Sequence, residues 1–273
     1  MYNKIVFFIF SILISDTNEF LLEESAEKLK KLKINIDFIG ASLNIKKSNR
    51  DINLSYFDNQ KRTTSMPEIN FSSFGRTGIL DISSNMIYNF KNINNDTIDL
   101  NLPKSIPIKF NLNLKNSNLK VNLDSIKVSS LNFDSNIGNS LLDFGNNFQS
   151  ECEYLTINIG LGSSEIKNLN NLSCEKTKIK CNGSSIILNI TNVLKKSNHI
   201  DLSISMGRVE INILNGNNLQ LNLDQPMMSK LNFEKMNLIK KNHYENEDFN
   251  KNFPVLKINT SIGLGSLDIN WIN

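Results

Sequence analysis

Residues 155–190, LTINIGLGSSEIKNLNNLSCEKTKIKCNGSSIILNI, decide the fold. They contain an alternating apolar–polar segment, a glycine turn, a short second alternating segment and a polar corner, after which the same pattern begins again. Because successive side chains of a β-strand point to opposite faces, each segment offers one apolar face and one solvated face. The stretch therefore predicts short strands joined at tight glycine turns.

The same unit recurs along the chain. Its turn positions, taken as Asn139, Gly162, Gly183 and Gly207, follow one another at intervals of 23, 21 and 24 residues. A unit with one apolar face buries it only by stacking on its neighbours, and a period in the twenties is typical of a β-solenoid. The competing all-β interpretation is a meander sandwich, whose hairpins favour two-residue turns of the kind found at Asn182-Gly183. The regular spacing favours the solenoid.

Alternation covers most of the chain. It begins at 32–38 and becomes nearly continuous after the Asn-rich linker 89–97. Residues 19–31, EFLLEESAEKLKK, have instead the spacing of a short amphipathic helix. Residues 224–253 break the alternation and are dense in charge, so we expect a long loop or distorted coil there.

Length, charge and the N-terminus bound the class of protein. The 273 residues can bury a substantial core, and a net charge of +3 is too balanced for a dedicated nucleic-acid binder. We interpret the abundance of Asn, Lys, Ile and Ser as compositional bias from an AT-rich genome. Lys4 precedes the apolar run 5–14, which suits a secretory signal, whereas a membrane span needs about 20 residues. We predict a signal peptide at 1–15, with an uncleaved anchor as the alternative.

Three cysteines are too few for a disulfide scaffold. Cys152 and Cys174 lie 22 residues apart, about one coil, and stacked coils bring equivalent residues to about 4.8 Å, within the Cα range of a disulfide. A disulfide and two unpaired small core residues are the alternatives for this pair. Cys181 falls on the inward side of its strand and is predicted to be a buried thiol.

The sequence predicts no catalytic residue, no cofactor and no metal. His199 falls on a solvated side and His243 in the irregular segment, whereas zinc needs a cluster of ligands. Gly160-x-Gly162 precedes a strand rather than the helix that a dinucleotide site needs. The carboxylates are spread singly, mostly at outward positions, which indicates a solubilising face rather than the clustered acids of a polysaccharide-cleaving β-helix enzyme.

One segment suggests recognition. Residues 232–254 carry Phe233, Tyr244, Phe249 and Phe253 among lysines and acids. Long loops on rigid scaffolds often bind partners, so these aromatics form a candidate recognition loop. The alternative is that they cap the end of the solenoid.

Three stretches, taken in order, carry a resemblance to a known family. The first is 32–45, followed by Tyr56, Pro67 and 78–82. The others are 98–144, which contains DLNLPKSIPIKFNLNL and LDSIKVSSLNF, and 258–271. Together they make the chain similar to the toast-rack superfamily, the bacterial envelope β-solenoid domains of LiaF-like cell-wall-active antibiotics response proteins and predicted adhesins. LiaF-like proteins usually carry N-terminal membrane helices, whereas this chain has only the signal-like run.

The resemblance implies an all-β, single-stranded, right-handed β-helix-like solenoid with no catalytic residues. We expect a signal peptide at 1–15, an N-terminal β module of the rack at 16–90 and the toast-rack β-solenoid at 91–273. The protein would be exported to the periplasm, cell surface or medium and act as a non-enzymatic binding or display module, linked to adhesion or envelope-stress sensing.

The expected partner is an envelope protein or cell-surface component, and self-association stays open. We expect no nucleic acid, and no membrane span beyond the signal. The alternatives to a binding module are a carbohydrate-active β-helix enzyme and a self-assembling structural surface protein.

Overall fold

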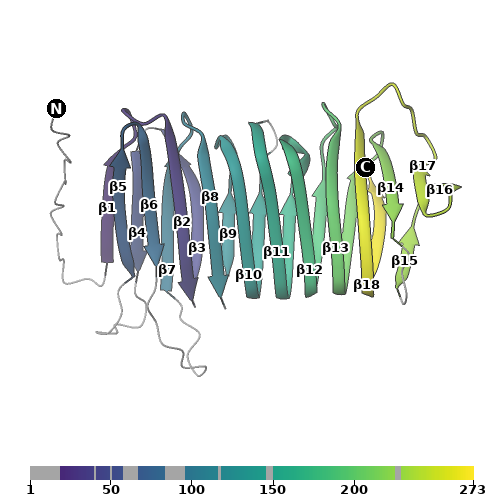
Figure 1. Cartoon of the computed structure of the whole chain (residues 1–273), viewed down its shortest axis with the longest axis horizontal. Helices are drawn as coiled ribbons and strands as arrows, with labels where there is room; N and C mark the ends of the chain where they lie inside the picture. Colours follow the sequence, from purple (N-terminus) through teal and green to yellow (C-terminus); the bar gives the residue numbers. More distant parts are fainter. Residues whose placement is uncertain are drawn as a thin grey trace.

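A computed structural model describes residues 19–39, 41–49, 51–57, 67–83, 96–115, 118–145, 150–224 and 229–273. Within these ranges the chain forms eighteen β-strands and one 3₁₀ turn, η1 (Leu169–Asn171). The strands wind into an elongated stack of rungs, with the N-terminal strands at one end and the C-terminal strands at the other (Figure 1). The predicted signal peptide 1–15 lies outside the described residues.

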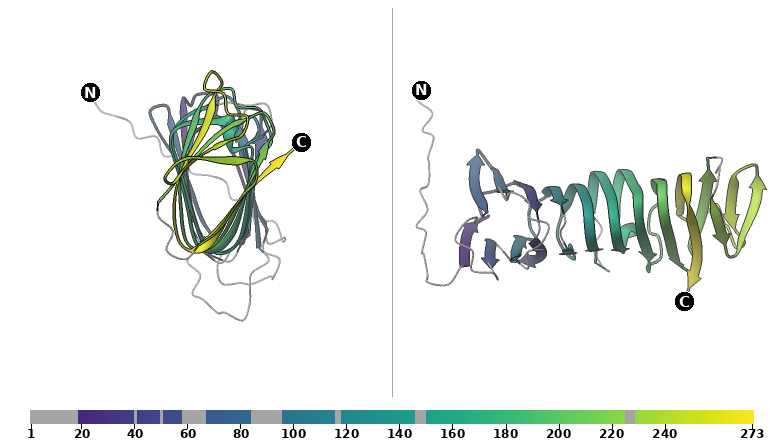
Figure 2. Two further views of the ribbon diagram at one scale, coloured as in Figure 1. Left: turned by 90° about the vertical axis from the view of Figure 1, so that its right-hand side faces the viewer. Right: turned by 90° about the horizontal axis from the view of Figure 1, so that it is seen from below.

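The central rungs are long strands that bend near a glycine and contribute to two opposite faces of the stack. Seen end-on, the rungs outline a flattened tube (Figure 2). We call the face formed by the N-terminal half of each rung the first face, and the face formed by the C-terminal half the second face. The bent rungs are β10 (Val128–Asp143), β11 (Ser150–Lys167), β12 (Leu172–Ile190), β13 (Asn198–Leu214) and β18 (Val255–Ile272).

Shorter strands complete both ends of the stack. Three rungs are divided into a first-face and a second-face strand: β2 (Lys31–Ile39) with β3 (Ala41–Ser48), β6 (Thr77–Ser83) with β7 (Asp96–Pro103), and β8 (Ile108–Lys115) with β9 (Leu119–Asn122). The remaining strands are β1 (Glu19–Ser25), β4 (Asp51–Phe57), β5 (Glu68–Phe74), β14 (Asn218–Leu223), β15 (Lys230–Phe233), β16 (Met236–Lys240) and β17 (His243–Asn246).

Parallel pairing in register builds the core. Phe133 pairs with Ile157, Ile157 with Ile179 and Ile179 with Leu202, and all four side chains are buried. Because adjacent strands lie about 4.8 Å apart, such columns place apolar side chains of successive rungs in contact. Burying a side chain of this size contributes about 1.5–3 kcal/mol, so the stacking of rungs stabilises the fold. The predicted all-β solenoid is confirmed.

The order of the rungs in space differs from their order in sequence at both ends. β18, the last strand, lies between β13 and β14. At the other end β2 lies between β6 and β8, and β3 lies between β7 and β9. The first and last full rungs are therefore paired on both edges. Strands before and after the predicted boundary at residue 90 pair with each other, as β2 does with β8, and the boundary itself stays a prediction.

The predicted helix at 19–31 is wrong. Residues Glu19–Ser25 form β1, which pairs antiparallel with β4 along its whole length. Leu22 and Ala26 are buried in the core. The strand forms because pairing with β4 and burial of these side chains outweigh the local helical spacing, which is a weak preference.

Two further details differ from the sequence prediction. The segment 224–253, expected to be a loop or distorted coil, contains the short strands β15, β16 and β17. The first turn glycine is Gly138, which has a φ of 139° and pairs with Gly162, rather than Asn139. Asparagine also tolerates a positive φ, so the sequence alone left the choice between these neighbours open.

Candidate functional site

The glycine corners determine how closely the rungs stack. Gly162 and Gly207 have φ values of 127° and 117°. A β-carbon at Gly162 would overlap the carbonyl oxygen of Gly138, and one at Gly207 would overlap that of Ser184. Adjacent rungs therefore meet backbone to backbone at this corner, which holds their outward side chains one strand spacing apart.

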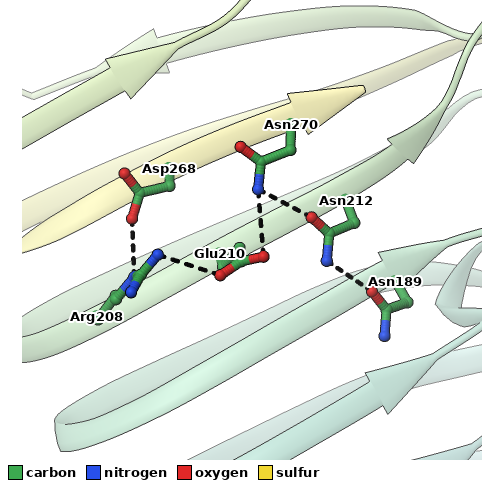
Figure 3. A network of polar contacts seen from close by, with 6 residues as sticks. All are labelled: Asn189, Arg208, Glu210, Asn212, Asp268 and Asn270. Atoms are coloured by element: carbon green, nitrogen blue, oxygen red, sulfur yellow. Dashed lines mark hydrogen bonds and ion pairs between the residues drawn. The ribbon is translucent and has the colours of Figure 1, made fainter. Parts of the chain in front are cut away.

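Outward polar side chains bond from rung to rung. On the second face, Asn270 donates to Asn212 over 3.0 Å and Asn212 donates to Asn189 over 2.9 Å. Beside this column the guanidinium of Arg208 donates to the carboxylate of Asp268 over 2.9 Å and to that of Glu210 over 3.2 Å. Figure 3 shows the six residues together: Asn189, Arg208, Glu210, Asn212, Asp268 and Asn270. Our compositional interpretation of the asparagines overlooked this structural role.

A longer chain of hydrogen bonds crosses the first face near its C-terminal end. The Nε2 of His199 lies 2.9 Å from both Asp201 Oδ1 and Asn259 Nδ2. Asn222 donates to Asn259 Oδ1 over 2.8 Å, and His243 Nδ1 lies 2.6 Å from Asn222 Oδ1. The chain spans β13, β18, β14 and β17, so both histidines of the protein belong to one network.

His199 lies on the outward side of its rung, as the sequence predicts, and its side chain is half-exposed. The placement of His243 in an irregular segment is wrong, because it begins β17 and its side chain is only 16% exposed. The antiparallel pairing of β17 with β14 brings His243 beside Asn222.

Three groups on the first face have a perturbed pKa: Asp201, Tyr154 and Lys109, whose own pKa is raised chiefly by its hydrogen bond with Tyr154. The hydrogen bond from His199 lowers the pKa of Asp201, partial burial opposes this, and the bond from Asn259 and the charge of Lys178 reinforce it. The pKa of Tyr154 is lowered chiefly by its hydrogen bond with Lys109. The ammonium of Lys109 lies 5.4 Å from the centroid of the Tyr154 ring.

Two shallow grooves lie on the first face. The smaller, of about 320 Å³, crosses β6, β2 and β8, and its amides and carboxylates bond to each other, with Asn35 donating to Asp81 and Asn111 donating to Asn35. The larger, of about 420 Å³, crosses β12, β13, β18 and β14. We call it the first-face groove. It is lined by the outward side chains of these strands, among them Lys178, Lys180, Asp201, Ser203, Asn222, Asp224, Asn259 and Ser261.

The two cysteines proposed as a pair lie side by side. Cys152 of β11 is in register with Cys174 of β12, the Cα atoms are 4.4 Å apart, and the structure joins the two sulfur atoms. Formation of the bond in the exported protein stays a prediction. Cys181 is fully buried, as predicted, and its Sγ lies 3.1 Å from the hydroxyl of Ser184.

The candidate recognition aromatics divide into two groups. Phe233 and Tyr244 pack edge to face, with ring centroids 5.2 Å apart, and both lie against the core. Phe249 is half-buried, whereas Phe253 is 62% exposed. The first pair covers the end of the apolar columns, and the role of the segment in recognition stays a prediction.

The described ranges contain no group of three or more His, Cys, Asp or Glu side chains placed to hold a metal ion. They also contain no helix with the length and apolar character needed to cross a membrane.

Comparison with known families matches residues 14–167, more than half of the chain, to the N-terminal domain of toast_rack, DUF2154. The chain belongs to this toast-rack family. A comparison with curated proteins finds no significant match to this toast-rack chain.

Solved structures similar to this toast-rack protein are distant in sequence. A "putative cell adhesion protein" from Clostridium sporogenes is 15% identical, with a TM-score of 0.48, and the alignment covers 94% of this chain and all of the other. A "putative adhesin" from Bacteroides fragilis is 12% identical, with a TM-score of 0.36 and coverages of 92% and 96%. A "Putative lipid binding protein" from Parabacteroides distasonis is 13% identical, with a TM-score of 0.37 and coverages of 94% and 98%.

Sequence reasoning missed the first-face groove. Asn222 and Asn259 are 37 residues apart, and only the insertion of β18 beside β14 places them in contact. The alternating pattern indicated that the side chains of Asn222 and Asn259 point outward, but it did not indicate which rungs are neighbours. The groove could therefore not be located from the sequence.

Proposed function

We propose that this toast-rack protein is an exported, non-enzymatic binding or display module of the bacterial cell envelope, linked to adhesion or envelope-stress sensing. Membership of the toast-rack family supports this proposal. The stiff stack of parallel rungs supports it too, because repeated rungs create extended surfaces that suit docking of a partner.

The observation that carries the proposal is the fixed polar surface of both faces. Asn35 donates to Asp81, Asn158 donates to Asp134, and the second-face column of Figure 3 extends across three rungs. Asn189 donates to Glu165 over 2.8 Å. Carboxylates held by amides of the next rung present a pre-organised pattern of donors and acceptors, which favours recognition of a polar partner.

Co-sedimentation of the full chain with isolated bacterial envelope tests this function. The proposal predicts saturable binding, with no release of new reducing ends from the envelope polysaccharide during prolonged incubation. Release that rises with time and stops in Asp201→Asn or Asp224→Asn would instead establish a carbohydrate-active enzyme, the alternative from a different class. Absence of saturable binding would overturn the proposal.

A self-assembling structural protein is the second candidate, favoured by the strands at the ends of the stack. Among the described residues, β5 pairs with β6 alone and β16 pairs with β17 alone, so each strand has one unpaired edge. Phe74 at the first end is 86% exposed, and Leu238 and Ile239 at the other are more than half exposed. Unpaired edges with apolar side chains are templates for further strands. Light scattering that shows mass growing with protein concentration would favour this candidate over a monomeric binder.

A further inference from the structure

The first-face groove has lysines along one edge, hydroxyl and amide groups on its floor, and the carboxylates of Asp201 and Asp224 among them. It crosses four neighbouring strands, which at about 4.8 Å per strand gives it a width of about 14 Å. Its volume of about 420 Å³ lies within the range of small-ligand sites, about 300–1,000 Å³. The groove can therefore hold a ligand of several linked rings lying across the rungs.

The lysines along one edge of the groove come from β12. Lys176, Lys178 and Lys180 alternate along this strand and point outward, so their Cα atoms follow one another at about 6.6 Å. None of the three ammonium groups forms an ion pair or hydrogen bond with another residue in the described ranges. Asp201, on the next rung, is bonded to His199 and Asn259, and the charge of Lys178 also acts on it. The ammonium groups of the lysines keep their hydrogen-bond donors for an external anion.

The floor consists of amides and hydroxyls with fixed orientations, beside the carboxylates of Asp201 and Asp224, which can accept hydrogen bonds from sugar hydroxyls. Asn259 donates to Asp201 over 3.2 Å, and Asn222 donates to Asn259, so each amide is held by its neighbour. Ser203 and Ser261 pair on adjacent rungs and add two hydroxyls. Hydroxyl and amide groups both donate and accept, which matches the hydroxyls of a sugar.

We propose that the first-face groove binds an acidic oligosaccharide. Its carboxylate or phosphate groups would bind Lys178 and Lys180, and its hydroxyls would bind the floor of Ser203, Ser261, Asn259 and Asn222. This assignment deepens the envelope-binding function proposed above and rests on it. A simple polyanion would need only the lysines, and a neutral sugar would need only the floor, so the two halves of the groove together select a ligand with both chemistries.

Calorimetric titration with three probes of four repeating units each tests the assignment: tetragalacturonic acid, neutral maltotetraose and linear tetrapolyphosphate. We expect one site for the uronic acid, about tenfold tighter than for either other probe, because maltotetraose lacks the charge-assisted hydrogen bonds to the lysines and tetrapolyphosphate lacks the hydroxyls that bind the floor. The double variant Lys178→Gln/Lys180→Gln should weaken uronic acid binding about tenfold or more. Lys104→Gln/Lys120→Gln, which removes the same charge at exposed sites that do not line the groove, should leave it unchanged.

Ser203→Ala/Ser261→Ala separates the two halves of the groove. It should weaken binding of the uronic acid but leave that of tetrapolyphosphate unchanged. Equal affinity for the uronic acid and tetrapolyphosphate, or equal loss in both lysine double variants, would overturn the assignment. Melting curves of each variant check that the stack is intact.

Envelope co-sedimentation of the same variants separates this assignment from the proposed function. Saturable envelope binding by a protein that binds none of the acidic sugar would overturn the groove assignment alone. Loss of envelope binding in the lysine variant, with the control variant unaffected, would support both.

Discussion

Gly162 shows how one residue controls the distance between rungs. It adopts a φ of 127°, and an added β-carbon would overlap the carbonyl oxygen of Gly138 on the next rung. Gly162→Ala should therefore lower the free energy of unfolding by about 3–5 kcal/mol, combining backbone strain with overpacking. Chemical denaturation measures this loss.

Gly216 provides the matched control. It has a φ of 86°, but an added β-carbon would meet no atom within 4 Å. Gly216→Ala should cost only the strain of the left-handed conformation, about 1–2 kcal/mol. Equal losses in the two variants would show that contact between rungs at the corner does not govern stability.

The pair formed by Lys109 and Tyr154 gives a pH-dependent signal from the first face. Because the bond to Lys109 favours the phenolate, the pKa of Tyr154 is lowered below its ordinary value. Lys109→Met should move this pKa upward, toward the ordinary value of about 10. The ring resonances of Tyr154 followed against pH measure the shift. Lys33→Met, one rung away, is the control; an unmoved titration in Lys109→Met would contradict the contact.

At the scale of elements, the cysteine pair ties β11 to β12. A cross-link closing a loop of 22 residues contributes about 3 kcal/mol by restricting the unfolded chain. Reduction of the purified, oxidised protein should lower the free energy of unfolding by about this amount, and the variant Cys152→Ser/Cys174→Ser should show no further change on reduction. Mass spectrometry without reductant provides the direct check, and free thiols at both positions would refute the disulfide.

The insertion of β18 predicts an unusual pattern of local stability. A terminal strand normally frays, but β18 is paired by β13 on one edge and by β14 and β15 on the other. Hydrogen exchange measured by mass spectrometry should find the amides of 255–272 as protected as those of β13. β16, which pairs only with β17, should exchange much faster. Rapid exchange across 255–272 would contradict the strand order.

Whether a segment forms a strand or a helix could be predicted where the side chains that become buried recur with the period of that structure. Leu155, Ile157 and Ile159 alternate and are all fully buried, so the strand at this position followed from the sequence. The helix predicted at residues 19–31 was wrong because the spacing of Leu22 and Ala26 is compatible with a helix. Only pairing with the strand β4 decides between helix and strand. The short strands within 230–246 have half-exposed side chains and therefore leave little periodic signal.

At the scale of the molecule, the sequence predicts a stack but does not specify the order of the rungs. Every rung carries the same alternating pattern, so the apolar columns continue whichever rungs are neighbours. Ile211, for example, pairs with Leu188 on one side and with Ile269 on the other, and all three side chains are buried. The first-face groove depends on that order, because β18 separates Ser203 from Asn222. For this reason the first-face groove could not be predicted from the sequence.

Distances between spin labels along one outward column test this arrangement most directly. Lys33, Lys109, Ser130, Tyr154, Lys176, His199, Lys257 and Gln220 occupy equivalent positions on consecutive rungs. With one label at position 33, we predict backbone separations of about 19 Å to position 176, about 29 Å to 257 and about 34 Å to 220. Position 220 must be the farthest although it precedes 257 in the chain. A shorter distance to 220 than to 257, or three similar distances, would contradict the stack of parallel rungs and the groove built on it.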